Sequence, residues 1–154
     1  MTINETIEIE APLSIVWEVF SRLEQWEEWS SVCRSCSLVE GDEFRQGACL
    51  SFTLRPYSVP IRITPRVTLC DPGKEVIWEG ERLGVRARHR FTFEATGNRV
   101  RLHSVEEFAG ALLWLSHLLF VPNRLHNLSR KLLQEIKARS ERLAKSASTC
   151  SSGN

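Results

Sequence analysis

Hydrophobic and polar residues alternate with a period of two through most of the chain, and the period changes near its C-terminus. From Arg34 to Phe108, short alternating runs are separated by turn residues, a pattern typical of antiparallel β-strands. The apolar residues from Ile61 to Leu69 are assigned to one of these strands. From Ala111 to Lys145, apolar residues follow a helical period, which predicts one long helix. The pattern therefore predicts an α+β protein.

The first part of the chain adds a lone strand and two short helices. Ile3 to Ile9 alternates as a strand, and Pro12 ends it because proline is suited to the first turn of a helix. A helix is predicted from Leu13 to Leu23, followed by a second short helix or turn from Leu23 to Trp29. The order is then one strand, two short helices, a run of six strands and one closing helix. A sheet that buries its apolar face against a single helix tends to leave a cavity, so this order predicts a ligand pocket.

Two positions break the apolar face of the predicted strands. His89 and Glu106 fall where hydrophobic residues are expected, and an unpaired charge there would be costly. The turn at Gly97 and Asn98 joins their strands, and pairing across such a hairpin sets His89 opposite Glu106. We therefore predict that the two side chains are close and face the interior.

The closing helix carries one apolar stripe, formed by Leu125, Leu128, Leu132, Ile136 and Leu143. Pro122 interrupts the backbone ladder, so the helix is expected to kink or restart there. The small polar residues 146–154 are predicted to form a flexible tail. We thus predict one domain over residues 1–145, followed by that tail.

Composition narrows the possible functions. The 154 residues suffice for one domain with a real core. A net charge of +1 argues against a general electrostatic grip on nucleic acid. The five cysteines form an odd set that suits reduced thiols, and the lone pair Cys33 and Cys36 lacks the further ligands of a zinc site. The four scattered histidines indicate no metal site either, and no cofactor is expected.

The chain carries no sign of membrane insertion. It does not open with a basic segment followed by an apolar one, so no signal peptide is expected. The apolar run from Ala109 to Val121 is interrupted by Ser116 and His117 and is too short to span a bilayer. We therefore expect a cytoplasmic protein without stable membrane insertion. The sequence leaves its oligomeric state open.

Three stretches have a distinctive order of residues: Pro12 to Phe20 followed by Trp26 and Trp29; Asp71-Pro72-Gly73 followed by Val76 to Gly80 and His89 to Phe91; and Glu106 to Gly110. Together they resemble the START-like (SRPBCC) superfamily, which includes the birch-pollen-allergen fold and the polyketide cyclase/dehydrase-like proteins. The resemblance extends from Ile3 to about Ala144.

The resemblance implies a helix-grip fold. In that fold a curved seven-stranded antiparallel sheet wraps around the long C-terminal helix. An apolar cavity lies between them, and the two short helices after the first strand close one end. The family supplies no universal catalytic residue, so the site residues are inferred from their placement alone.

The residues predicted to contact a ligand lie on the inward faces of these elements. They are Trp26, Phe52, Trp78, His89, Phe91, Glu106, Phe108, Trp114 and His117. Aromatic residues equally serve core packing, and Trp17 and Trp29 are assigned mainly to that role.

Three functions remain open at this stage. The leading one is binding, transport or sensing of a small hydrophobic molecule such as a lipid, isoprenoid or polyketide-like compound. The second is a cyclase, dehydrase or hydrolase in which His89 and Glu106 move protons. The third is an interaction protein that uses its sheet, which has the least support because the pattern reveals no large exposed apolar patch. For His89 and Glu106 a ligand-orienting role ranks first, a structural role second and catalysis third.

Overall fold

The computed structural model describes residues 1–40, 43–54, 60–82, 84–110 and 121–151. An eight-stranded antiparallel sheet has the order β1-β8-β7-β6-β5-β3-β2, and β4 pairs with β3 off this path. The strands are β1 (Thr2–Ile9), β2 (Cys33–Glu40), β3 (Cys49–Leu54), β4 (Ile61–Ile63), β5 (Arg66–Asp71), β6 (Glu75–Arg82), β7 (Val85–Thr96) and β8 (Arg99–Ala109). The helices are α1 (Leu13–Ser21), the 3₁₀-helix η1 (Leu23–Gln25), α2 (Trp26–Trp29) and α4 (Val121–Ser151).

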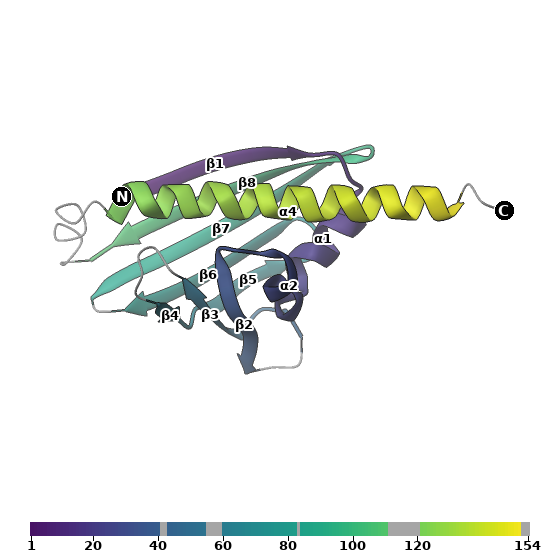
Figure 1. Ribbon diagram of the computed structural model, residues 1–154. Coiled ribbons are helices and arrows are strands. Elements are labelled where there is room, and N and C mark those ends of the chain that lie inside the picture. Colours follow the sequence, from purple (N-terminus) through teal and green to yellow (C-terminus); the bar gives the residue numbers. More distant parts are fainter. Residues whose placement is uncertain (41–42, 55–59, 83, 111–120, 152–154) are drawn as a thin grey trace.

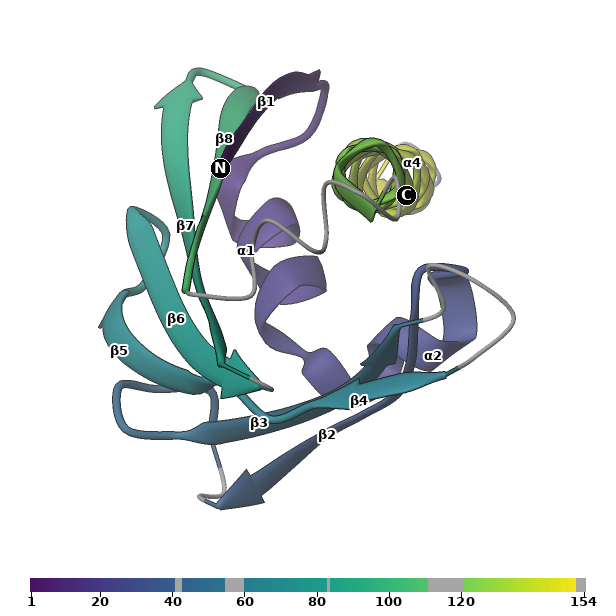
Figure 2. The same ribbon diagram turned by 90° about the vertical axis from the view of Figure 1, so that its left-hand side faces the viewer.

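The sheet curves around the long helix α4. In the view along α4, the strands from β1 to β2 form a bent wall that runs past one side of the helix and beneath it (Figure 2). The short helix α1 lies under the C-terminal half of α4, and α2 lies below the middle of α4 (Figure 1). This is the predicted helix-grip arrangement, with the short helices at one end.

A cluster of aromatic rings forms the core between the sheet and α1. Phe20 of α1 is fully buried, and its ring stacks on Trp78 at a centroid distance of 5.9 Å and meets Phe91 at 4.9 Å. Trp17 packs edge-on against Phe93, with centroids 5.6 Å apart. Burying large apolar rings is the main source of stability in such a core. The predicted packing role of Trp17 is therefore confirmed.

One predicted strand is divided in the structure. The segment from Ile61 to Leu69 forms two strands, β4 and β5, which separate at Pro65. Proline lacks the N–H needed for an unbroken ladder. The carbonyl of Pro65 instead accepts a hydrogen bond from the N–H of Leu50, at 2.8 Å. The sheet consequently has eight strands rather than seven.

The closing helix is longer than predicted at its C-terminal end. It continues from Lys145 to Ser151, so residues 146–151, which the sequence assigned to a flexible tail, are helical. Ser146 and Thr149 each donate a hydroxyl hydrogen bond to the carbonyl four residues earlier, so both hydroxyls have partners within the helix. Pro122 is the second residue of the described helix. Residues 111–120 and 152–154 lie outside the described part.

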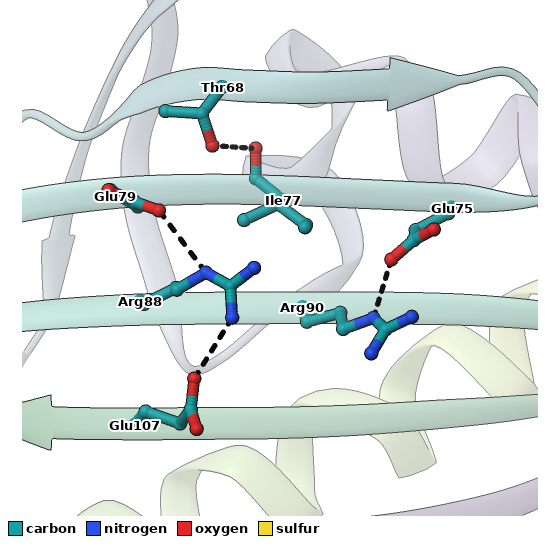
Figure 3. A network of polar contacts seen from close by, with 7 residues as sticks. All are labelled: Thr68, Glu75, Ile77, Glu79, Arg88, Arg90 and Glu107. Carbon is teal, nitrogen blue, oxygen red and sulfur yellow. Dashed lines mark hydrogen bonds and ion pairs between the residues drawn. The ribbon is translucent and has the colours of Figure 1, made fainter.

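The convex face of the sheet carries arginines that are neutralised by neighbouring carboxylates (Figure 3). Arg88 lies between two partners, with Nε 3.2 Å from Glu79 and a terminal nitrogen 3.1 Å from Glu107. Arg90 pairs with Glu75 at 2.5 Å. This face therefore carries a ladder of ion pairs. Within the described residues, no helix is both long enough and apolar enough to cross a membrane.

Candidate functional site

A cavity of ≈ 460 Å³ lies between the concave face of the sheet and α4. This volume falls within the range of small-molecule sites in proteins. Its deep walls are mostly apolar and include the buried residues Trp26, Val32, Phe52, Trp78 and Leu132. The indole N–H of Trp26 donates to the carbonyls of Val19 and Phe20, both at 3.1 Å, which holds this ring in place.

Most of the residues predicted to contact a ligand line this cavity. They are Trp26, Phe52, Trp78, His89, Glu106 and Phe108. Phe91 does not line it, because its ring is fully buried behind His89, stacked at a centroid distance of 3.9 Å. Phe91 therefore packs against a residue of the cavity wall, and its contact with a ligand stays a prediction. Trp114 and His117 lie outside the described residues.

The side chains of His89 and Glu106 are in polar contact on the cavity wall. They are directly opposite each other in the β7–β8 register, as predicted from the turn that joins these strands. Nδ1 of His89 lies 3.1 Å from Oε1 of Glu106, and Nε2 of His89 lies 2.7 Å from Oγ of Ser104. From α4, the hydroxyl of Ser129 donates a hydrogen bond to Glu106. The four side chains form one chain of polar contacts that links β7, β8 and α4.

Burial favours the uncharged form of both members of this pair. It raises the pKa of the Glu106 carboxyl to about 7, and the hydrogen bond from Ser129 offsets part of that rise. It also lowers the pKa of the His89 imidazole to about 3. Both shifts arise because removal from water disfavours the charged form. Below about pH 7 the protonated carboxyl can donate to Nδ1 of His89, whose Nε2–H then donates to Ser104.

Ser104 and Ser129 were not predicted as site residues. Ser104 lies on the inward face of the last predicted strand, two positions before Glu106, and that alternation could have identified it. Ser129 lies one helical turn after Leu125 on the apolar stripe, where a buried polar side chain calls for a partner. The partner, Glu106, is distant in sequence, so the helix pattern alone could not name it.

The Cys33 and Cys36 thiols both lie in the interior, and Cys33 lines the cavity. Residues three apart on a regular strand would face opposite sides of the sheet. Here the register shifts between Arg34 and Ser37, and Ser35 has a positive φ of 52°, so both thiols face inward. A hydrogen bond with Cys36, together with burial, raises the pKa of Cys33 well above its ordinary value. Cys33 is therefore a neutral thiol, poorly suited to act as a nucleophile.

The described residues contain no cluster of three or more histidine, cysteine, aspartate or glutamate side chains that could hold a metal ion. The polar chain around His89 and Glu106 is built from two serines, an imidazole and a carboxyl. Such a set can orient an uncharged oxygen of a ligand by hydrogen bonds, or move a proton to or from it. The remainder of the buried wall offers apolar contact.

Comparisons with known proteins agree with this architecture. The sequence model of the family described as polyketide cyclase / dehydrase and lipid transport matches residues 1–141. No match was found among curated proteins.

Solved structures with the same fold are similar over almost the whole chain. TTHA0849 from Thermus thermophilus has a TM-score of 0.78 at 14% identity, covering 94% of this chain and 99% of its own. The Zhui aromatase/cyclase from Streptomyces sp. R1128 also has a TM-score of 0.78 at 14% identity, with 92% and 94% covered. A START superfamily protein from Mycobacterium smegmatis has a TM-score of 0.68 at 12% identity, with 95% and 98% covered. At these identities the similarity establishes the fold.

Proposed function

This chain belongs to the polyketide cyclase / dehydrase and lipid transport family, and from that premise we propose that it binds a small, mainly apolar molecule in its internal cavity. One observation carries the proposal: a largely apolar cavity of ≈ 460 Å³ has a buried cluster of polar side chains at His89 and Glu106 on its wall. Apolar walls supply affinity by removing ligand surface from water, at roughly 25 cal/mol per Å². Lipids, isoprenoids and polyketide-like compounds have the required apolar surface.

The polar cluster would fix the orientation of the ligand. Between about pH 3 and pH 7, His89 and Glu106 are both uncharged. An uncharged pair favours a carbonyl or hydroxyl oxygen over an ionised group, because a buried charge without a countercharge is costly. Each hydrogen bond adds only about 1 kcal/mol net, so the pair contributes more to orientation than to affinity.

Catalysis as a cyclase or dehydrase is the second candidate, and the pKa of Glu106 favours it. A carboxyl with a pKa of about 7 is populated in both protonation states near neutral pH, which suits a general acid and base. Its carboxylate could take a proton from a carbon next to a ligand carbonyl. The resulting carboxylic acid could return that proton to a departing hydroxyl group, which would leave as water. The similarity in fold to an aromatase/cyclase is compatible with such a step.

The proposal is for a protein that works in the cytoplasm on a small molecule. Its net charge of +1 gives no general attraction for nucleic acid. In this proposal the protein contacts a membrane only to take up or release an apolar ligand, and it does not insert stably.

Binding can be tested with Nile red, an uncharged apolar dye, and with a variant that fills the cavity. Ala87 lines the cavity on β7, so Ala87→Phe should weaken dye binding by roughly tenfold or more. Ala95 lies on the same strand and is exposed, so Ala95→Phe serves as the matched control and should bind as the wild type does. Equal binding by all three proteins, or none by the wild type, would contradict the proposal.

Native mass spectrometry of the purified protein would then identify a retained ligand. A ligand released unchanged would support the carrier. Conversion of that compound to a product lighter by one water would support the dehydrase.

A further inference from the structure

The cavity opens toward solvent at one identifiable edge. Among its lining residues, those that are exposed are Arg62 and Thr64 near β4, and Glu81 and Arg82 at the end of β6. The residues around His89 are buried. The end of β6 and the neighbouring β4 therefore form the rim of the cavity, and His89 with Glu106 lies on a more deeply buried part of its wall.

Arg82 is placed on this rim with its charge uncompensated. It shares the inward face of β6 with Trp78 and Gly80, opposite Val85 in the register with β7. Its guanidinium donates a hydrogen bond to the backbone carbonyl of Arg62. No carboxylate of the described residues lies within ion-pair distance of it. A guanidinium has five N–H donors, so one bond to a carbonyl leaves several available.

The other arginines of β5, β7 and β8 differ from Arg82 in this respect. Each of them forms an ion pair with a carboxylate: Arg66, Arg86, Arg88, Arg90, Arg99 and Arg101. Pairing is thus the rule for the arginines of these three strands.

The neighbours of Arg82 do not neutralise it. Glu81, the acidic residue exposed at the rim, has its own partner in Arg86 at 3.6 Å. Arg62 lies opposite Thr53 in the register of β4 with β3, on the face away from the cavity, and its Nε donates to Oγ of Ser51 at 2.9 Å. Within the described residues, Arg82 therefore gives the rim an unpaired positive charge.

We propose that the rim at Arg82 binds an anionic head group, so that the ligand of this cavity is an amphipathic acid with a carboxylate or phosphate at one end. This inference rests on the proposed function and names the ligand class. The apolar body would occupy the cavity, and an uncharged oxygen along it would reach His89 and Glu106. The charged end stays at the exposed rim, where water and a guanidinium both stabilise it, and so avoids the cost of burial.

The test compares four ligands that share one chain length: decanoate, decyl phosphate, methyl decanoate and decanol. Each is titrated against the protein loaded with Nile red, and its affinity is read from displacement of the dye. We expect at least one of the two anions to bind roughly tenfold or more tightly than the uncharged compounds. That preference should shrink as salt is raised, because the rim is exposed. Which anion binds more tightly identifies the head group.

Three variants then test whether Arg82 causes the preference for the anionic ligands. Arg82→Gln should lower the affinity for the preferred anion roughly tenfold and leave the affinity for methyl decanoate unchanged. Arg82→Lys should keep most of the preference for the anion, because lysine keeps the positive charge. Arg90→Gln removes an ion-paired arginine from the convex face and should bind as the wild type does. Equal affinity of the wild type for all four compounds would overturn this inference while leaving cavity binding intact. Failure of Nile red and all four compounds to bind would overturn the proposed function itself.

Discussion

Nδ1 of His89 lies 3.1 Å from Oε1 of Glu106, and both side chains line the cavity between the sheet and α4. The contact couples two ionisable groups whose pKa values burial shifts in opposite directions, to about 3 for His89 and about 7 for Glu106. A buried pair of this kind affects both stability and ligand chemistry, and the two effects can be measured separately.

The first prediction concerns stability against pH. The pKa of Glu106 is raised from 4.5 in the folded protein, so its contribution to stability is present below pH 4.5 and is lost as the pH rises through 7. The pKa of His89 is lowered from 6.5, so its contribution is present above pH 6.5 and is lost as the pH falls toward 3. Between about pH 4.5 and 6.5 the folded and unfolded states each bind one proton on this pair, and the two effects cancel.

Glu106→Gln should remove the contribution of Glu106 to the pH dependence of stability and leave that of His89 without its opposing effect. Relative to the wild type, the free energy of unfolding of the variant should rise by about 3 kcal/mol between pH 4.5 and pH 7. Urea denaturation at a series of pH values measures the difference. Curves for wild type and variant that stay parallel over this range would show that the Glu106 carboxyl is not desolvated in the folded state.

His89→Gln distinguishes the two candidate functions. In a carrier the change should alter ligand affinity only modestly, by about 1 kcal/mol, because it exchanges one neutral hydrogen-bonding group for another. In an enzyme it should lower the rate by roughly 100-fold, the usual scale for disturbing general acid or base catalysis. Affinity is measured by dye displacement and rate by mass spectrometry of the product. A loss of affinity of several orders of magnitude without any turnover would contradict both the carrier and the enzyme.

A substitution at Ile136 tests whether α4 packs against the hydrophobic core. Its side chain is fully buried on the inward stripe of the helix, so Ile136→Ala should lower the free energy of unfolding by about 2–5 kcal/mol. Gln134 is exposed on the same helix, and Gln134→Ala is the matched control, with an expected change within about 0.5 kcal/mol. If thermal unfolding of both variants matched the wild type, the helix would not form part of the core.

Two buried serines of α4 should respond in opposite directions to alanine. Ser140 is fully buried, and its hydroxyl has no hydrogen-bond partner among the described residues. Ser140→Ala should therefore leave stability unchanged or raise it by about 1 kcal/mol, since an unpaired buried hydroxyl is unfavourable. Ser129→Ala should instead destabilise the protein and raise the pKa of Glu106 further, because it removes the hydrogen bond from Ser129 to that carboxyl. Equal losses in both variants would indicate that Ser140 has a partner in solution.

Short-range patterns in the sequence were enough to predict much of the fold. The period-two alternation identified the concave faces of β6, β7 and β8, because neighbouring residues of a strand must face opposite sides. The turn at Gly97 determined which residues of β7 and β8 are paired, and with it the contact of His89 with Glu106. These features depend on residues close together in the chain, and this is why the sequence contains them.

Contacts between distant elements were decided only by the tertiary structure. The bulge that turns Cys33 and Cys36 to the same side depends on how β2 pairs with β3. Glu5 shares the inward face of β1 with the isoleucines, and its partner Arg130, at 3.1 Å, comes from α4. Whether an arginine such as Arg82 meets a carboxylate depends likewise on the placement of neighbouring strands. Alternation assigns a side chain to a face, but its burial, partners and pKa depend on the elements packed against that face, which are far away in the sequence.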